Sequence, residues 1–438
     1  MNPSSPASTA ARSLLVLTRF SPLGQSGSAT YLFSLLRHLQ SHGVRITLCW
    51  SEQPAIVWRR GWWVVPKEIA EVATLLLPGG ICLGRLRLFP SALLDPWKKR
   101  LRQALKRALL ALGLGPLLGL QRDVAPTVPP DAPAADPYAW NRPPDPYEKT
   151  FFGRALARLR PDAVLANYCW LNPILRQSAD PCLKISLTHD LRHRASMLVH
   201  GRIVGCEGET MDRETETAYL READLIVAIR DDDAETFRRL LPGKEVLTAL
   251  PAFTATPCRS TPLPLRCLFV AAGNEANREG ITWFLREAWP QVRAAHPSAE
   301  LHLCGTICQQ ISPKEPGVIL RGFVDSLPAV YEEAAAVIVP LLRGSGVKIK
   351  LLEALAHGKA CVSTPIGVEG VPVLEDCVCI AGLASEFAAH VVRLLADAEA
   401  RRGMEARARA TIAARFSPEA CYGPLCARIL ETPPSPAP

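Results

Sequence analysis

The sequence, 438 residues long, lacks several features that would each assign it to a class of protein. No run of about 20 apolar residues is present, which excludes a conventional membrane-spanning helix. No C-x-x-C pair occurs among the 14 cysteines, which lie singly among apolar residues and indicate buried thiols in a reducing cytosol. The motifs of P-loop enzymes, α/β-hydrolases and helical zinc proteases are missing too. Residues 1–11 lack the charged start of a signal peptide, so we expect a cytoplasmic protein.

The excess of positive over negative charge is concentrated in one segment. Residues 58–122 contain 12 Lys/Arg against 3 Asp/Glu, whereas the whole chain has a net charge of +8. Charge concentrated in this way predicts a local basic surface rather than a nucleic-acid-binding protein. The segment begins with several tryptophans, and residues 98–112 suit a basic amphipathic helix, so we hypothesise that 58–122 docks on an anionic membrane surface. A basic insertion that stays in solution explains the same pattern, and both interpretations remain open.

Outside this segment, strand and helix patterns alternate along the chain. A buried strand at residues 13–20, a glycine-bearing loop, a helix at 29–41 and a strand at 44–50 open a parallel, doubly wound sheet. Ligands of such sheets bind at the carboxyl ends of the strands. We therefore predict an α/β protein with two Rossmann-like domains that face a central cleft. The expected divisions are an N-terminal domain over 1–255, with the basic insertion at 58–122 and a Pro-rich loop at 123–146, a C-terminal domain over 263–417, a helix over 418–431 that packs back on the first domain, and a disordered tail over 432–438.

The most informative segment follows a predicted strand that ends at Pro340. A turn at residues 344–346 opens a helix whose first turn contains Lys348 and Lys350. Cations there oppose the helix dipole, and a bound anion would reverse that penalty. Glu353, three residues after Lys350, suits the hydroxyls of a ribose, so the face fits a nucleoside diphosphate. A solvated helix face with an ordinary Lys–Glu pair explains the spacing equally well.

Two further groups of residues lie where strands end. In the first domain, Gly27 belongs to a loop that would allow a phosphate to approach, although a plain tight turn explains it as well. His189 and Asp190 follow a predicted central strand, where a histidine suits polar contact or proton transfer, with a structural histidine as the alternative. In the second domain, Gly273 ends a strand and Arg278 could reach a phosphate.

Together these segments resemble the retaining GT-B glycosyltransferases of family 4, also called group 1. The resemblance covers about residues 13–50 and 160–430 and is closest in three runs of the second domain: FVAAGNEANREGITWFL, ELHLCG and VILRGFVDSLPAVYEEAAAVIVPLLRGSGVKIKLLEALAHGKACVSTPIGVEG. It implies the GT-B architecture and transfer of a sugar, with retention of anomeric configuration, from a nucleotide-diphosphate sugar to a glycan or lipid-linked acceptor. It also implies that neither a metal nor a cofactor is needed, because lysines and backbone N–H groups stabilise the diphosphate leaving group. Cell-surface polysaccharide or glycolipid synthesis on the cytoplasmic membrane face is the implied setting.

The resemblance also implies roles for individual residues. Glu353 would bind the donor ribose, Lys350 the diphosphate, and His189 the transferred sugar near its anomeric carbon. The implied catalytic pair is His189 and Asp190, and the implied donor-binding set is Gly27, Gly273, Arg278, Val324, Ser345, Gly346, Lys348, Lys350 and Glu353.

The chain departs from the family pattern at two positions. Ser345 replaces the first glutamate of the E-x7-E motif, and Glu279 stands where a lysine is usual. Two alternatives therefore stay open. One is a nucleotide-sugar epimerase of the same fold, for which Asp190 and Glu369 are the available carboxylates, and the other is a non-catalytic scaffold with this fold.

Overall fold

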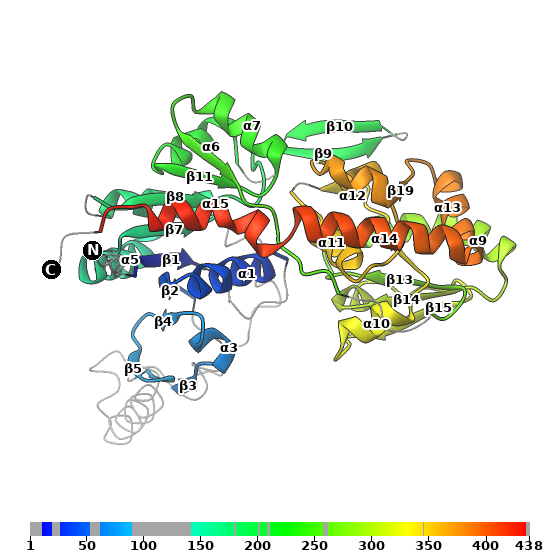
Figure 1. The fold of residues 1–438 in the computed structure, drawn as a ribbon, viewed down its shortest axis with the longest axis horizontal. Helices are drawn as coiled ribbons and strands as arrows, with labels where there is room; N and C mark the ends of the chain where they lie inside the picture. The colour runs from blue at the N-terminus through cyan, green and yellow to red at the C-terminus, as the bar shows by residue number, and fades with distance from the viewer. Residues whose placement is uncertain are drawn as a thin grey trace, which may run out of the picture.

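The structure is a computed structural model that describes residues 11–19, 27–52, 62–89, 142–178, 181–199, 202–207, 211–256, 262–344 and 346–434. The predicted basic helix at 98–112, most of the Pro-rich loop and Ser345 lie outside the described residues. Two domains lie side by side, and each is built around its own parallel sheet (Figure 1). The predicted fold class, two doubly wound α/β domains, is confirmed.

The first domain is built on a seven-stranded parallel sheet with the strand order β12-β11-β8-β7-β1-β2-β4. Its central strands are buried on both faces, as their continuous apolar sequences predict. The strands are β1 (Ser13–Thr18), β2 (Arg45–Trp50), β4 (Thr74–Leu76), β7 (Ala163–Asn167), β8 (Leu183–Leu187), β11 (Leu225–Ala228) and β12 (Glu245–Thr248). The helices are α1 (Gly27–Ser41), α5 (Pro146–Leu159), α6 (Arg213–Leu220) and α7 (Asp231–Leu240), with a 3-10 segment at Cys169–Gln177.

Helix α5 begins with a capping box and a buried ion pair. The Asp145 side chain accepts a hydrogen bond from the Glu148 backbone, and the Glu148 side chain accepts one from the Asp145 backbone. Arg19, directly after β1, donates to both oxygens of Glu148 at 2.8 and 2.9 Å. Burial raises the pKa of Glu148, but the hydrogen bonds and charge of Arg19, together with hydrogen bonds from the Asp145 backbone and Ser51, outweigh it and hold the pKa at about 2. This pair therefore fixes α5 to the carboxyl end of β1.

The second domain is built on a six-stranded parallel sheet with the order β15-β14-β13-β16-β18-β19. Its strands are β13 (Arg266–Val270), β14 (Glu300–Cys304), β15 (Val318–Gly322), β16 (Ala336–Val339), β18 (Cys361–Ser363) and β19 (Val378–Ile380). Its helices are α8 (Glu275–Trp283), α9 (Trp289–Ala295), α10 (Leu327–Glu333), α11 (Ile349–Ala356), α12 (Pro365–Val368), α13 (Ala384–Ala396) and α14 (Ala398–Arg415). Between α8 and α9 lies a π-helical segment, Phe284–Ala288.

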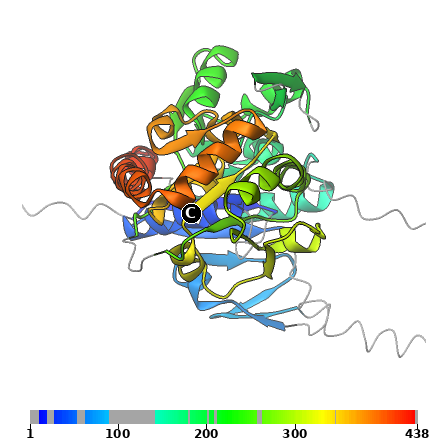
Figure 2. The same ribbon diagram turned by 90° about the vertical axis from the view of Figure 1, so that its right-hand side faces the viewer.

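Two small antiparallel sheets have no counterpart in the predicted elements. One has the order β3-β6-β5 and lies within the basic insertion, beside the main sheet of the first domain (Figures 1 and 2). The other is a hairpin of the first domain that reaches across to the second and pairs with a two-residue strand there. The elements are β3 (Trp62–Val64), the short helix α3 (Lys67–Ala70), β5 (Ile81–Leu83), β6 (Leu86–Leu88), β9 (Arg194–Val199), β10 (Arg202–Glu207) and β17 (Arg343–Gly344).

The last helix, α15 (Pro418–Leu430), returns to the first domain and lies along α1 (Figure 1). Arg428 on α15 pairs with Glu245 at 2.9 Å. Thr432 is buried, and its carbonyl accepts a hydrogen bond from Arg12 at 2.7 Å, so the chain stays ordered beyond the predicted start of the tail at 432. Among the described residues, no helix is long and apolar enough to cross a membrane.

Candidate functional site

The carboxyl ends of the two sheets meet where Gly346 of the second domain touches His189 of the first. A Cβ atom on Gly346 would lie 2.7 Å from the His189 carbonyl oxygen, and Gly346 has a φ of +67°. Both the close approach and the backbone conformation therefore require glycine. Nearby, a Cβ on Gly27 would lie 2.9 Å from Ile349 in the first turn of α11. Gly27 and Gly346 are thus two points of close approach between the domains at the predicted site.

His189 is held in one orientation by residues that follow neighbouring strands. Its Nε2 lies 2.8 Å from Oδ1 of Asn167, whose amide nitrogen donates to Thr18 at 3.1 Å. Because Asn167 presents its oxygen, His189 donates from Nε2 and keeps Nδ1 as an acceptor. The imidazole stacks on the Tyr168 ring at 4.1 Å, and the Tyr168 hydroxyl contacts the Ser28 hydroxyl at 2.8 Å. Sequence reasoning missed both Asn167 and Tyr168, although they end the strand beside β8.

The protonation state of His189 follows from its surroundings. Burial is the main cause that lowers its pKa, to about 4, with Asp190 opposing and Arg192 adding to the effect. At neutral pH the imidazole is therefore neutral and acts as a hydrogen-bonding group rather than a cation. Asp190 accepts from Nη1 of Arg192 through both oxygens, at 2.8 and 2.7 Å. His193, four residues after His189, contacts Glu216 through its Nδ1 at 2.6 Å.

The two lysines of the predicted phosphate site lie at the start of α11, with Lys348 buried and Lys350 half-buried. Lys348 is the N-cap residue, and its ammonium donates to the Gly346 carbonyl at 2.6 Å. Lys350 donates to Oδ1 of Asn277, a residue of α8 that the sequence did not single out. Burial lowers the pKa of Lys348 to about 8 and of Lys350 to about 7, and for Lys350 the charge of Lys348 adds to the effect. Two neighbouring cations at a helix N-terminus are unfavourable alone and become favourable beside an anion.

The two other residues predicted near a phosphate, Gly273 and Arg278, have partners within their own domain. Arg278 is exposed and faces Glu275 at 3.4 Å, because α8 starts at Glu275 and turns Arg278 toward solvent. Gly273 donates its N–H to Thr306 at 2.8 Å, and a Cβ on it would lie 2.9 Å from the Thr306 carbonyl oxygen. Glu279, at the position where the family has lysine, pairs with Arg343 at 2.8 Å. The arginine of this pair lies in β17, two residues before Ser345.

Glu353 lies on the buried side of α11 beside two aromatic rings. Its Oε2 accepts a hydrogen bond from the Tyr331 hydroxyl at 3.0 Å, and the Tyr331 ring stacks on His357 at 4.6 Å. Burial raises the pKa of Glu353, and the Tyr331 hydrogen bond opposes this shift. Glu353 and Lys350 thus each have a partner of their own, Tyr331 and Asn277. Val324 is half-buried against the core of the cleft.

A cavity of about 270 Å³ adjoins Gly346 on the side of α7. Arg230 extends into this region: its Nε has no hydrogen-bond partner, and its Nη1 lies 3.9 Å from Glu369 of the second domain. Burial raises the pKa of Asp233, on the same wall, to about 6. The lining residues are Leu191, Arg194, Arg230, Asp232, Asp233, Glu235, Thr236, Arg239, Gly346 and Glu369. Their many charged groups suit a ligand rich in hydroxyls.

Comparison with known proteins identifies the second domain. Residues 264–397 match the family described as glycosyl transferases group 1. A protein from the cps region of Klebsiella pneumoniae, described as uncharacterized, is 29% identical over 128 residues, which are 26% of this chain. The match spans only 33% of that relative's length.

Solved structures share the fold of nearly the whole chain. S. aureus TarM, in complex with Fondaparinux, alpha-GlcNAc-glycerol and UDP, has a TM-score of 0.65 at 10% identity, over 96% of this chain and 100% of its own. Sucrose-phosphate synthase from Thermosynechococcus elongatus has a TM-score of 0.61 at 15% identity, over 95% and 99%. The lipopolysaccharide outer core galactosyltransferase WaaB has a TM-score of 0.53 at 14% identity, over 94% and 97%. The resemblance to GT-B glycosyltransferases of group 1 is confirmed.

Proposed function

We propose that this GT-B chain, whose residues 264–397 match the group 1 glycosyltransferases, is a retaining enzyme that transfers a sugar from a nucleotide-diphosphate sugar. The observation that carries the proposal is the contact of Gly346 with the His189 carbonyl. This contact brings Lys348 and Lys350, at the start of α11, close to the end of β8, which His189 follows. A phosphate-binding helix and a neutral, oriented hydrogen-bonding side chain thereby face the same point in the cleft.

In this proposal the donor nucleotide lies on α11. Lys350, Lys348 and the first N–H groups of the helix bind the diphosphate, and Glu353 accepts hydrogen bonds from the ribose hydroxyls. The Tyr331 hydroxyl orients Glu353, while Asn277 orients Lys350. As the bond between sugar and diphosphate breaks, negative charge grows on the phosphate oxygens. The lysines and N–H groups stabilise that charge without a metal ion or a cofactor.

His189 would position the transferred sugar rather than accept its proton. A pKa of about 4 leaves the imidazole neutral, and its orientation is fixed by Asn167 and Tyr168. Asp190 is engaged by Arg192 and Glu369 lies near Arg230, so neither carboxylate is placed as the acid or base that an epimerase needs. The departing phosphate then serves as the base for the acceptor hydroxyl, and attack from that face retains the anomeric configuration.

We further propose a glycan or lipid-linked acceptor of cell-surface polysaccharide or glycolipid synthesis. The charged cavity beside Gly346 would take its sugar hydroxyls. In the basic insertion, the antiparallel sheet exposes apolar side chains, which suits peripheral docking on an anionic membrane at the cytoplasmic face. These side chains are Trp62, Val64, Ile81 and Leu83, exposed by 41%, 45%, 51% and 57%. Three similar proteins support this setting: the protein from a cps region, the lipopolysaccharide galactosyltransferase WaaB, and TarM in complex with Fondaparinux.

Thermal unfolding with UDP, GDP, ADP and dTDP tests the donor site. At 100 times its Kd, a nucleotide stabilises the folded state by about 2.7 kcal/mol, a shift in Tm of a few degrees. We expect one nucleotide to raise the Tm of the wild type and of Glu386→Ala, an exposed glutamate on α13, but not that of Glu353→Ala. A shift that survives Glu353→Ala would contradict the ribose role. No shift with any nucleotide would favour the scaffold interpretation.

With the donor base known, the anomeric configuration of the first product tests the reaction. We expect proton NMR to show the configuration of the donor sugar in a glycoside formed only when an acceptor is present. An epimerised nucleotide sugar in the absence of acceptor would favour the epimerase instead. Flotation with anionic vesicles tests the membrane surface, and protein that stays unbound would contradict it.

A further inference from the structure

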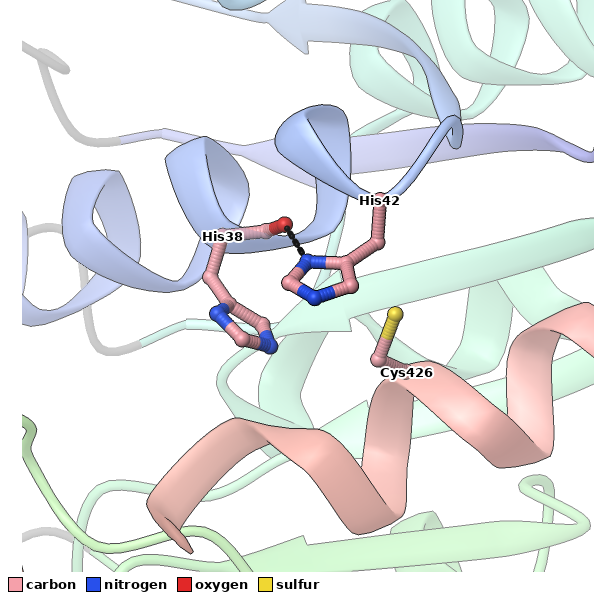
Figure 3. A group of neighbouring side chains, drawn as sticks. All are labelled: His38, His42 and Cys426. Carbon is pink, nitrogen blue, oxygen red and sulfur yellow. Dashed lines mark hydrogen bonds between the residues drawn. The ribbon is translucent and has the colours of Figure 1, made fainter. Parts of the chain in front are cut away.

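A group of metal-ligand side chains lies between α1 and α15, outside the cleft. His38 lies in the last turn of α1, His42 follows directly after the helix ends at Ser41, and Cys426 faces both from α15 (Figure 3). One ligand atom from each residue lies within 4.8 Å of the others. Because α1 belongs to the first domain and α15 follows the last helix of the second, the group joins segments nearly 400 residues apart in the chain.

The two histidines present nitrogens that are ready to bind a metal. Nδ1 of His42 lies 2.9 Å from the His38 carbonyl oxygen, and since a carbonyl only accepts, Nδ1 carries the hydrogen and Nε2 keeps its lone pair. A hydrogen bond from the second nitrogen to a carbonyl is the usual way in which a ligating histidine is oriented. His38 is only 7% exposed, and within the described part of the chain its Nε2 has no hydrogen-bond partner. Buried polar atoms without a partner are rare and call for an explanation.

A fourth ligand lies beside the three. The Glu419 carboxylate, at the start of α15, lies 3.8 Å from Nε2 of His38 and 3.5 Å from Nε2 of His42. Its side chain is 75% exposed and can move toward an ion. Imidazole nitrogen, thiolate sulfur and carboxylate oxygen are all ligands of zinc, and four of them complete its tetrahedral coordination.

We propose that His38, His42, Cys426 and Glu419 bind one zinc ion, which joins α15 to α1. In a tetrahedral zinc site the ligand atoms are roughly 3.3–3.8 Å apart, so the group needs a contraction of about 1 Å. Zinc replaces the proton of the Cys426 thiol, which passes to solvent, and coordinates the thiolate. The ion supplies the missing partner of His38 Nε2.

The proposed ion has a structural role and no part in the transfer reaction. His38 lies eleven residues after Gly27, about 16 Å along α1 from the cleft. The Tyr422 ring of α15 packs edge-on between the rings of His38 and Tyr31, at 5.7 and 6.0 Å, and Tyr31 in turn contacts His189 at 5.6 Å. Zinc would thus fix the helix pair that supports His189 from behind.

Metal titration of the full chain, freed of any affinity tag, tests the site. After treatment with EDTA, we expect the protein to bind one equivalent of Zn²⁺ and its Tm to rise by a few degrees. Co²⁺ should give the ligand-field bands of a tetrahedral site and a thiolate-to-cobalt charge-transfer band. His42→Ala should weaken Zn²⁺ binding at least about 100-fold, and Cys426→Ser should remove the charge-transfer band.

Two variants provide matched controls, because each removes a ligand-type side chain elsewhere. His390→Ala and Cys82→Ser should bind Zn²⁺ as the wild type does. His42 is 42% exposed at its side chain, so His42→Ala should fold even if Cys426→Ser does not. Equal Zn²⁺ affinity in the wild type and His42→Ala, or Co²⁺ spectra without the thiolate band, would overturn the proposal. Nucleotide binding by the EDTA-treated protein is measured separately, so the two proposals can fail independently.

Discussion

The two sides of the cleft are built from opposite kinds of side chain. On the first domain, His189 is neutral, stacked on Tyr168 and fixed by an amide, and the nearby Asp190 is neutralised by Arg192. On the second domain, Lys348 is buried and Lys350 half-buried at a helix N-terminus, with pKa values of about 8 and 7. The polar groups on the first domain therefore have their partners without a ligand. The lysines on the second domain, by contrast, are stabilised when an anion binds. This difference predicts that donor affinity resides in the second domain and sugar positioning in the first.

The largest expected effect comes from removing Lys350, the cation on the second-domain side of the cleft. Lys350→Ala removes a charge from the leaving diphosphate, and we expect kcat/KM to fall by about 10³ and nucleotide affinity to fall by about 100-fold. Steady-state kinetics and calorimetric titration measure the two. Lys314→Ala, an exposed lysine of the same domain, serves as the control and should leave both unchanged. Nucleotide affinity that survives Lys350→Ala would place the diphosphate elsewhere.

The fold and the two sides of the cleft were only partly predictable from the sequence. The apolar runs placed the strands at 13–20 and 44–50 and the helix at 418–431 within two residues of the bounds of β1, β2 and α15, since hydrophobic periodicity is a local signal. The start of α8 was not predicted: Asn274 caps the helix, which begins at Glu275 and contains Arg278. The signal, an asparagine before the helix, was present in the sequence.

Other parts of the site depend on contacts between distant segments, which no local pattern reveals. Asn277 meets Lys350 only because α8 and α11 follow different strands of one sheet. Tyr331 meets Glu353 for the same reason. The hairpin β9–β10 pairs with a strand of two residues in the other domain, too short to leave a periodic signal. The capping box at Asp145 and Glu148, by contrast, was a readable motif that was missed.

A smaller effect is expected on the first side of the cleft. His189→Ala removes a neutral hydrogen-bonding group, and we expect kcat/KM to fall by about 10² while nucleotide affinity stays within about threefold of the wild type. The same kinetic and calorimetric measurements apply. His390→Ala, on α13 of the second domain, is the matched control. If His189→Ala weakened nucleotide binding as much as Lys350→Ala, the two sides would not differ in role.

The smallest effect, and the sharpest test of the contrast, is proton uptake on nucleotide binding. With a pKa of about 7, Lys350 is mostly neutral at pH 8, and Lys348, with a pKa of about 8, is half-charged. A bound diphosphate raises both pKa values, so the two lysines together should take up about 1.4 protons on binding at pH 8 and only about 0.1 at pH 6. Nucleotide affinity should accordingly fall as the pH rises from about 7 to 9.

Calorimetric titration in two buffers of different ionisation enthalpy measures this uptake. Lys350→Arg keeps the positive charge at all these pH values, so it should bind nucleotide with less proton uptake than the wild type. His189, already neutral above about pH 5, should contribute nothing, and His189→Ala should show the wild-type uptake. Absence of uptake at pH 8 in the wild type would mean that the lysines are charged before the donor arrives. The second side of the cleft would then be as well satisfied without a ligand as the first.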